Sequence, residues 1–413
     1  MVSTSTVPKG KKTASATVLD KDLTSFLQED FPGLPFSQKV FFLHELAHWV
    51  RQNHAANCFF YRRGVESVSL QWDGGDALEF QRCSSDRPIW TLRRRRGQIQ
   101  DLAALYAQSY TTVNRADRFR FLRAYFGPQV RLKDLRSLLR DVERVGLCQI
   151  FRKLKQRQKF CWGTNRDFQV ETVGRFVVRR RATEQAAALV AALLPDPEGL
   201  LAGGERLPGR GNNCLTHKIQ FGASTFVVKR YAARDWVYKL KHAFRHSRGV
   251  RVWGASWELI SRSDPVPEPL LCLEEQNVCF PGVSYLVFEF FSDSQTLTCF
   301  WPQADKNQKL NLLANLAKKL GRIHRLKAIH GDTNWDNVLV LDDQRLVLID
   351  LDCSRFFRWY RPKRVEKDIQ HVFRDLRRLE KNSVAYERFF YRVWQRWAHF
   401  LPRRGRGASA KLQ

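Results

Sequence analysis

The chain has 413 residues, 44% of them hydrophobic and 12% aromatic, which is too long for one ordinary domain and too apolar for a disordered chain. It carries 70 Lys and Arg against 41 Asp and Glu, a formal net charge of +29. We therefore expect two packed units and a polyanionic partner, which composition alone leaves open as nucleic acid, anionic lipid headgroups or a phosphorylated glycan.

Two absences bound the location. The longest uncharged runs, 276–288 among them, have 13 residues, below the roughly 18 to 20 needed to cross a bilayer, and the first residues lack the apolar stretch of a signal peptide. The nine cysteines include no CxxC pair, which fits free thiols better than disulfides or a zinc site. We expect a protein of a reducing compartment without a transmembrane helix.

The first half of the chain contains a helical segment, LHELAHWVRQNH (43–54), that matches LANLAKKLGRIH (313–324) at an offset of 270 residues. Each is followed by a polar turn and a hairpin, and QDLAAL (100–105) pairs with KDIQHV (367–372) further on. Identities are few, so the alternatives are a true internal duplication and the general likeness of amphipathic helices.

The second half is predicted to alternate strands and helices. Strands are expected at 218–220 and 225–230 around Gly222, then a basic helical stretch from Trp236 onward and a strand at 285–290. The apolar spacing of 312–326 predicts a helix, and 338–341 and 345–349 predict a hairpin after a polar turn. This order is that of a two-lobed phosphotransferase.

The polar turn HGDTNWDN contains the most informative spacing. Asp332 followed five residues later by Asn337 is the catalytic-loop spacing that places a carboxylate at an acceptor hydroxyl and a carboxamide oxygen on Mg²⁺. The alternative is an ordinary turn leading into a hairpin. Asp350, after the second hairpin strand, stands where a kinase carries its second metal-binding aspartate, although Leu351-Asp352 departs from the usual Phe-Gly.

Lys229 ends the run FVVKRY and is the candidate ligand of the nucleotide phosphates, about a hundred residues ahead of Asp332. A lysine at a strand end is more often a solvated edge residue. The segment 207–218 stands where a phosphate-covering loop belongs but lacks G-x-G-x-x-G. Glu258 is either the partner of Lys229 or a surface acid.

Basic residues recur along the whole chain. No acid occurs from Trp236 to Trp257, and the cations of this stretch include Lys239, Lys241 and Arg245, a pattern suited to an anionic interface. Each basic run taken alone is also compatible with a solvated face. His44, His48 and His54 share one helix without a carboxylate or cysteine at ligand spacing, so we interpret them as packing or surface residues.

These residues resemble the lipopolysaccharide-core kinases, which include Kdo and heptose kinases and InaA-type proteins. The likeness covers most of residues 200–380 and is carried by FVVKRY (226–231), SRGVRVWGASWELI (247–260), PVPEPLL (265–271), YLVFEFF (285–291), LGRIHRLKAIHGDTNWDN (320–337), LVLIDLDCSRF (346–356) and KDIQHVFRDL (367–376). The resemblance implies ATP and Mg²⁺ as cofactors. It also implies site roles: Asp332 as catalytic aspartate, Asn337 and Asp350 as metal ligands, Lys229 as phosphate ligand, and the backbone near Glu289 and Phe291 as the adenine-contacting hinge.

Residues 36–165 also resemble the C-terminal lobe of this family, but without its chemistry. In the repeat alignment Arg62 takes the place of Asp332, Ser67 that of Asn337 and Glu79 that of Asp350. Only some 35 residues precede this copy, so we expect either a vestigial lobe or a true start upstream.

We expect an α+β, protein-kinase-like two-lobed fold preceded by a degenerate partial kinase C-lobe. The expected divisions are 1–165 (degenerate copy), 166–292 (N-lobe to hinge), 293–400 (C-lobe) and 401–413 (basic tail).

The expected function is phosphorylation of a sugar hydroxyl of lipopolysaccharide core, with an anionic glycolipid or saccharide as acceptor. The expected location is cytoplasmic, peripheral at the anionic inner-membrane surface of a Gram-negative-type bacterium, without a nucleic-acid partner. The alternatives are a kinase of another acceptor, protein or small molecule, and a non-catalytic basic scaffold at membrane or nucleic acid.

Overall fold

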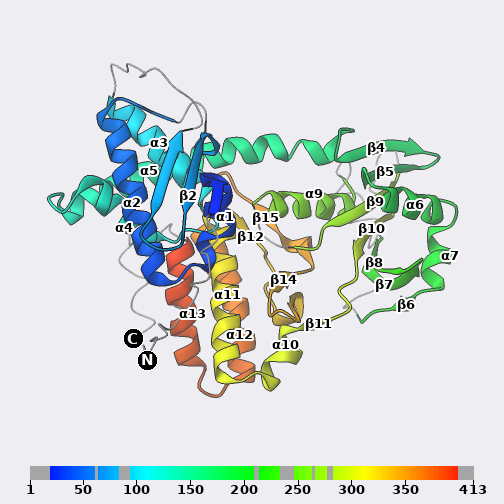
Figure 1. Ribbon diagram of the computed structural model, residues 1–413. Helices are drawn as coiled ribbons and strands as arrows, with labels where there is room; N and C mark the ends of the chain where they lie inside the picture. Colours follow the sequence, from blue (N-terminus) through cyan, green and yellow to red (C-terminus); the bar gives the residue numbers. More distant parts are fainter. Residues whose placement is uncertain are drawn as a thin grey trace, which may run out of the picture. The chain divides into compact units, whose positions relative to one another are not determined.

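The computed structural model describes residues 19–60, 64–82, 94–208, 214–232, 246–262, 266–276 and 282–398 (Figure 1). Its internal contacts divide the chain into a first unit, Met1–Ile150, and a second unit, Phe151–Gln413. Among the described helices, none is long and apolar enough to cross a membrane. The basic stretch with Lys239, Lys241 and Arg245 lies outside the described residues.

The first unit combines a small antiparallel sheet with helices. In chain order its main elements are β1 (Leu19–Asp22), α1 (Leu23–Glu29), α2 (Phe36–Ala55), β2 (Val68–Trp72), β3 (Leu78–Arg82), α3 (Arg94–Gln108), α4 (Arg115–Phe126) and α5 (Leu132–Arg157), whose last turns extend past Ile150. The strand order is β1-β2-β3. Helix α2 buries Leu43, Leu46 and Val50 on one face, as the helical periodicity predicts.

The second unit begins with a seven-stranded antiparallel sheet of order β4-β5-β9-β10-β8-β7-β6. Its strands are β4 (Phe168–Val173), β5 (Phe176–Arg181), β6 (Glu205–Arg206), β7 (Cys214–Phe221), β8 (Ser224–Tyr231), β9 (Pro269–Glu275) and β10 (Ser284–Glu289), and its helices are α6 (Glu184–Leu193), α7 (Pro197–Ala202) and α9 (Arg248–Ser261).

Both faces of this sheet are covered (Figure 1). Val228 and Val287 belong to the apolar cluster that contains Leu189 and Leu193 of α6, whereas Leu286 belongs to the cluster that contains Trp253 of α9. Because successive strand residues point to opposite faces, the nearly continuous apolar runs of β8 and β10 supply both clusters. The sheet is therefore buried on two sides, with Lys229 on its β8 strand.

The rest of the second unit is mainly helical. Its elements are β11 (Ser294–Thr296), α10 (Leu297–Phe300), α11 (Lys306–Arg325), β12 (Ala328–Ile329), β13 (Val338–Leu341), β14 (Leu346–Leu348), β15 (Arg355–Phe356), α12 (Pro362–Leu379) and α13 (Ser383–Ala398). Asp305 begins α11 with a capping box completed by Gln308. Leu312, Leu316, Leu320 and Ile323 of α11 are fully buried. A sheet-rich part followed by a helical part gives the second unit the α+β class expected from the sequence.

Most predicted elements of the second unit are present. The strands around Gly222 are β7 and β8, the helix at 312–326 is α11, and the hairpin is β13-β14. Strands β4 and β5 were not predicted; β5 pairs with β9, with Val178 opposite Leu273. The seven cysteines in the described part of the chain are free thiols.

The two units repeat one series of elements. Helix α2 and helix α11 correspond residue for residue at the offset of 270, and the sheet β1-β2-β3 corresponds to β11-β13-β14. Asp22 and Thr296 each end the first strand of the series and cap the following helix by accepting backbone N–H bonds. The two units are therefore alike in this capping hydrogen bond as well as in the order of their elements.

A buried histidine–aspartate pair occurs in both copies. In the first unit Asp101 Oδ2 lies 3.0 Å from His54 Nε2 and accepts from the Phe60 backbone N–H at 3.0 Å. In the second unit Asp368 Oδ2 makes the same two contacts, to His324 Nε2 and the His330 backbone N–H, each at 3.0 Å. His54 is therefore a buried packing residue, and Asp101 and Asp368 fix the alignment of α3 on α12 at an offset of 267.

Candidate active site

The catalytic-loop candidates Asp332 and Asn337 lie together between β12 and β13. Asn337 Nδ2 donates to the Asp332 backbone oxygen at 3.0 Å and to its Oδ2 at 3.2 Å. This turns the amide nitrogen toward Asp332 and leaves the amide oxygen for another partner. Gly331 has φ of +88°, and a Cβ there would lie 2.3 Å from the Cys353 backbone oxygen, so the turn before Asp332 requires glycine.

Asp368, a residue that sequence reasoning did not single out, holds this loop from α12. Besides the His330 N–H it accepts the Gly331 N–H at 2.8 Å, and it is 1% exposed. Burial raises the pKa of the Asp368 carboxyl, but the hydrogen bonds from His324 and the Gly331 N–H outweigh burial and hold the pKa below its usual value. The loop is therefore anchored by a buried carboxylate.

Asp350 and Lys229 form an ion pair, with Lys229 Nζ 3.0 Å from Asp350 Oδ1. Asp350 lies two residues after β14 and is in the left-handed region at φ of +59°, a conformation that aspartate tolerates better than most residues. His330 Nε2 donates to the carbonyl of the preceding Ile349 at 2.9 Å. Burial raises the pKa of Asp350, but the Lys229 ammonium outweighs it, and the net pKa is lowered.

A second ion pair, between Arg248 and Asp352, lies beside the first and was also missed by sequence reasoning. Arg248 is the first residue of α9, and its guanidinium donates to Asp352 Oδ2 at 2.5 Å. The Asp352 side chain is 8% exposed and its Oδ1 has no hydrogen-bond partner in the described residues. Burial raises the pKa of Asp352, and the Arg248 charge offsets only part of that effect. The departure of Leu351-Asp352 from the usual Phe-Gly was the signal in the sequence that could have pointed to Asp352.

The remaining sequence candidates take other places. Glu258 pairs with Arg262 at 2.7 Å, so it is the partner of Arg262 and Lys229 pairs with Asp350. Glu289 is the last residue of β10, and the Phe291 carbonyl that follows accepts from Ser294 Oγ at 2.8 Å. Most of the expected phosphate-covering loop, 209–213, lies outside the described residues.

The chemistry of these residues fits a nucleotide and Mg²⁺. Asp350 and Asn337 supply the hard oxygen donors that Mg²⁺ prefers. The Ile349 backbone N–H donates to the Asn337 backbone carbonyl at 3.0 Å, which brings Asp350 and Asn337 close together. The buried, unpartnered Asp352 Oδ1 adds an acceptor beside them. The described residues contain no cluster of three or more His, Cys, Asp or Glu suited to a metal, and Mg²⁺ in phosphotransferases commonly has few protein ligands besides phosphates and water.

In the first unit the expected replacements are only partly described. Arg62 lies outside the described residues, and Ser67 occupies the Asn337 place, its N–H donating to Gly64 O as that of Asn337 donates to Asn334 O. The assignment of Glu79 to Asp350 is wrong. Phe80 pairs with Leu70, as Leu346 pairs with Val340, so the counterpart of Asp350 is Ser84, outside the described residues; the hairpin of the first copy is four residues longer, which shifts the register.

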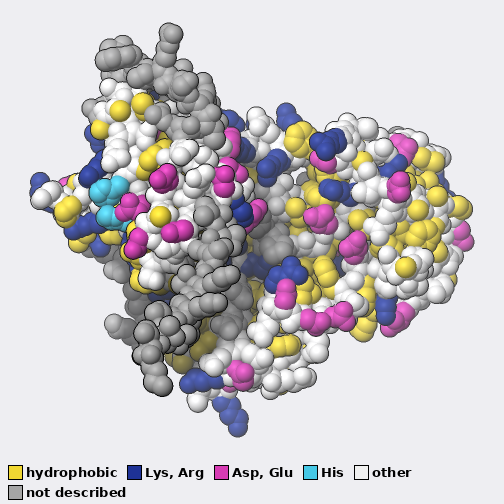
Figure 2. All heavy atoms as spheres, viewed as in Figure 1, with side chains coloured by type: hydrophobic (Ala, Val, Ile, Leu, Met, Phe, Trp, Pro, Cys, Tyr) yellow, Lys and Arg dark blue, Asp and Glu magenta, His cyan; other side chains and the backbone are white. Residues whose placement is uncertain are grey.

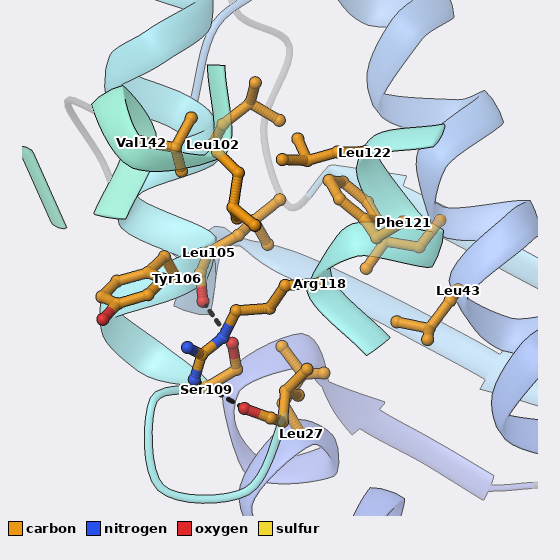
Figure 3. Close-up of a pocket in the computed structure, with 13 residues that line it drawn as sticks. Leu27, Leu43, Leu102, Leu105, Tyr106, Ser109, Arg118, Phe121, Leu122 and Val142 are labelled. Atoms are coloured by element: carbon orange, nitrogen blue, oxygen red, sulfur yellow. Dashed lines mark hydrogen bonds between the residues drawn. The ribbon is translucent and has the colours of Figure 1, made fainter. Parts of the chain in front are cut away.

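The described part of the first unit contains an apolar pocket (Figure 3). It is lined by Leu27, Leu43, Leu46, Leu102, Leu105, Tyr106, Ser109, Val113, Arg118, Phe121, Leu122, Leu139 and Val142. Its buried Arg118 donates to the backbone oxygens of Tyr110 and Val113 and so closes the loop after α3. No carboxylate lines this pocket, and it lacks the donor set of a nucleotide–metal site.

A strand lysine paired with an aspartate, next to an aspartate–asparagine loop, defines the second unit as a phosphotransferase with an alcohol group as acceptor, a kinase. Residues 224–397 match the model of the "Lipopolysaccharide kinase (Kdo/WaaP) family". This part of the second unit is therefore similar to that family.

A solved structure described as "WaaP in complex with acyl carrier protein" is similar at 18% sequence identity and a TM-score of 0.37, covering 49% of this chain and 86% of that chain. No curated protein matched the sequence.

Proposed function

We propose that the protein transfers the γ-phosphate of ATP, with Mg²⁺, to a sugar hydroxyl of lipopolysaccharide core. The observation that carries the proposal is the convergence of the Lys229–Asp350 pair and the Asp332–Asn337 pair on one site. Phosphoryl transfer needs positioning and charge stabilisation more than covalent help, and these four side chains supply both.

Each side chain has a distinct role in this proposal. Asp332 accepts the proton of the acceptor hydroxyl through its carboxylate, which Asn337 orients. Lys229 would bind the nucleotide phosphates, and Asp350 and Asn337 would hold Mg²⁺, which would neutralise charge on the phosphates. The backbone from Glu289 to Phe291 contacts adenine.

The deciding experiment measures transfer of labelled γ-phosphate to lipid A–core saccharides, to protein and to water alone. Asp332→Asn should abolish transfer while ATP binding and the circular dichroism spectrum stay unchanged, because only the acceptor-side carboxylate is lost. Labelled saccharide that depends on Asp332 supports the proposal. Transfer to protein and not to saccharide would show that the acceptor is a protein. Full activity of Asp332→Asn would refute the catalytic role of Asp332.

We further propose that the protein is peripheral at an anionic membrane on the cytoplasmic side. Support comes from the net charge of +29. On the face shown in Figure 2, Lys and Arg are interspersed with Asp and Glu, so the surplus charge is not gathered on that face. Sedimentation with vesicles should rise with anionic lipid, fall with salt and weaken when Lys239, Lys241 and Arg245 are reversed in charge. Equal binding to neutral vesicles, or tighter binding to duplex DNA, would contradict this location.

Finally, we propose that residues 1–165 are a degenerate copy of the kinase C-lobe. The shared series of elements and the shared histidine–aspartate pair support a common origin. Ser67 in place of Asn337 removes a metal ligand, so the copy retains the packing of the lobe and lacks its chemistry.

A further inference from the structure

Four cations and a histidine lie along one face of α12. Their numbers advance by three and four residues in turn, which keeps side chains on one side of a helix. They are Arg364, Lys367, His371, Arg374 and Arg378, here called the cationic row. All are exposed except His371, which is partly buried, while the opposite face buries Ile369, Val372 and Leu376.

The middle of the cationic row lies against the catalytic loop. His371 Nδ1 is 3.9 Å from Asp332 Oδ1, and Arg374 donates to Asn334 Oδ1. An acceptor whose hydroxyl meets Asp332 therefore lies beside these cations.

The row is not explained by the stability of α12. Like charges one turn apart destabilise a helix, and Arg364 and Lys367 lie near the N-terminus of α12, where cations oppose the helix dipole. The structure pairs Arg374 with Asp375 at 3.6 Å, but gives Arg364, Lys367 and Arg378 no acidic partner among the described residues. Glu366, exposed nearby, accepts instead from Gln370.

The first unit offers an internal comparison, because Asp101 and Asp368 align α3 on α12. Core positions keep their character: Leu102, Leu105 and Tyr106 match Ile369, Val372 and Phe373. Every position of the cationic row is uncharged in the first unit, where Gly97, Gln100, Ala104, Ala107 and Thr111 stand, the last beyond the end of α3. The cations thus accompany the catalytic residues and are not needed for packing.

We propose that the cationic row binds carboxylate or phosphate groups of an oligosaccharide acceptor and holds its hydroxyl at Asp332. This inference rests on the proposed function and names the surface that recognises the acceptor. The row spans 15 residues from Arg364 to Arg378, about 21 Å at the rise of an α-helix, which is longer than one sugar ring. An oligosaccharide with several anionic groups therefore fits it better than a monosaccharide.

The test replaces the two cations that flank the middle of the row with the residues of the first unit, Lys367→Gln with Arg378→Thr, in the full chain. The acceptor is de-O-acylated lipid A–core oligosaccharide, either native or dephosphorylated and carboxyl-reduced. With the native acceptor, KM for the saccharide should rise at least tenfold while KM for ATP stays within twofold. With the neutralised acceptor the variant and the wild type should have the same KM.

The matched control, Arg388→Gln with Arg392→Gln, removes two exposed cations from α13 and should leave every parameter unchanged. The proposal would be overturned if KM for the saccharide rose equally in the control, rose equally with the neutralised acceptor, or did not rise at all. It would also be overturned if only an acidic protein acceptor were affected. If the wild type phosphorylates no saccharide, the proposed function fails. Calorimetric binding of the native oligosaccharide then tests the cationic row separately. Tenfold weaker binding by the Lys367→Gln/Arg378→Thr variant then supports the row, and equal or absent binding refutes it.

Discussion

Arg248 and Asp352 join the start of α9 to the segment that carries Asp350. The same end of α9 is tied to the sheet, because the Ser247 N–H donates to Glu274 Oε1 at 2.9 Å and Arg179 donates to Glu274 Oε2 at 3.0 Å. The sheet, α9 and the Asp350 segment thus form one chain of polar contacts. In the described residues these polar contacts connect α9 to the phosphate site, a role for which the sequence had suggested Glu258.

Arg248→Ala should lower stability and impair ATP use together. Removal of one partner leaves the Asp352 carboxylate buried and unpaired, which costs up to about 3 kcal/mol, at the low end for a buried pair because Arg248 is partly exposed. Thermal unfolding should show the loss, and kcat/KM for ATP should fall at least tenfold.

The matched control for that prediction is Arg248→Met with Asp352→Leu, which replaces the pair by apolar groups. It should recover most of the stability, because no charge is left buried, but not the ATP kinetics. If Arg248→Ala behaves as the wild type in both measurements, the pair does not join α9 to the site.

Asp350→Ala removes a hard oxygen ligand and the partner of Lys229. We expect the Mg²⁺ concentration for half-maximal ATP binding to rise at least tenfold. Titration of Mg²⁺ with fluorescence of a bound ATP analogue measures this shift. Asp343→Ala, an exposed acid of the neighbouring turn, is the control and should leave the titration unchanged; an unaltered titration in Asp350→Ala would remove this residue from the metal site.

The buried Asp368 predicts a pH dependence of stability. Its folded-state pKa is lowered, so its stabilisation is present above the unfolded value of about 3.9 and is lost as the pH falls through the folded value. Urea unfolding between pH 6 and pH 3 should show a steeper loss below about pH 4 in the wild type than in Asp368→Asn.

Asp101→Asn makes the same change in the first unit, at His54 and the Phe60 N–H. Both substitutions should lower the melting temperature, but only Asp368→Asn should also reduce kcat, because Asp368 holds the catalytic loop. Equal effects on kcat would contradict this division between the two copies.

Sequence spacing located the parts of the site that are close along the chain. Asp332 and Asn337 sit in one turn, and the apolar strands beside Lys229 and Asp350 have strong patterns, so their placement followed from local rules. Arg248 and Asp352 are 104 residues apart in the sequence. Whether Arg248 or Glu258 connects α9 to the site depends on how α9 is rotated against the sheet. The misassigned Glu79 has the same cause, since hairpin register depends on loop length, which few identities cannot fix.

The last prediction concerns the first unit and uses the full chain. If residues 1–165 lack nucleotide chemistry, calorimetry should find one ATP bound per chain in the presence of Mg²⁺. Lys229→Met with Asp350→Ala should abolish all of it, because both changes are confined to the site of the second unit. Ser67→Ala, at the place of Asn337 in the first unit, is the control and should leave stoichiometry and affinity unchanged. Mg²⁺-dependent ATP binding that survives the double substitution would show a second functional nucleotide site and would end the interpretation of the first unit as a catalytically empty copy.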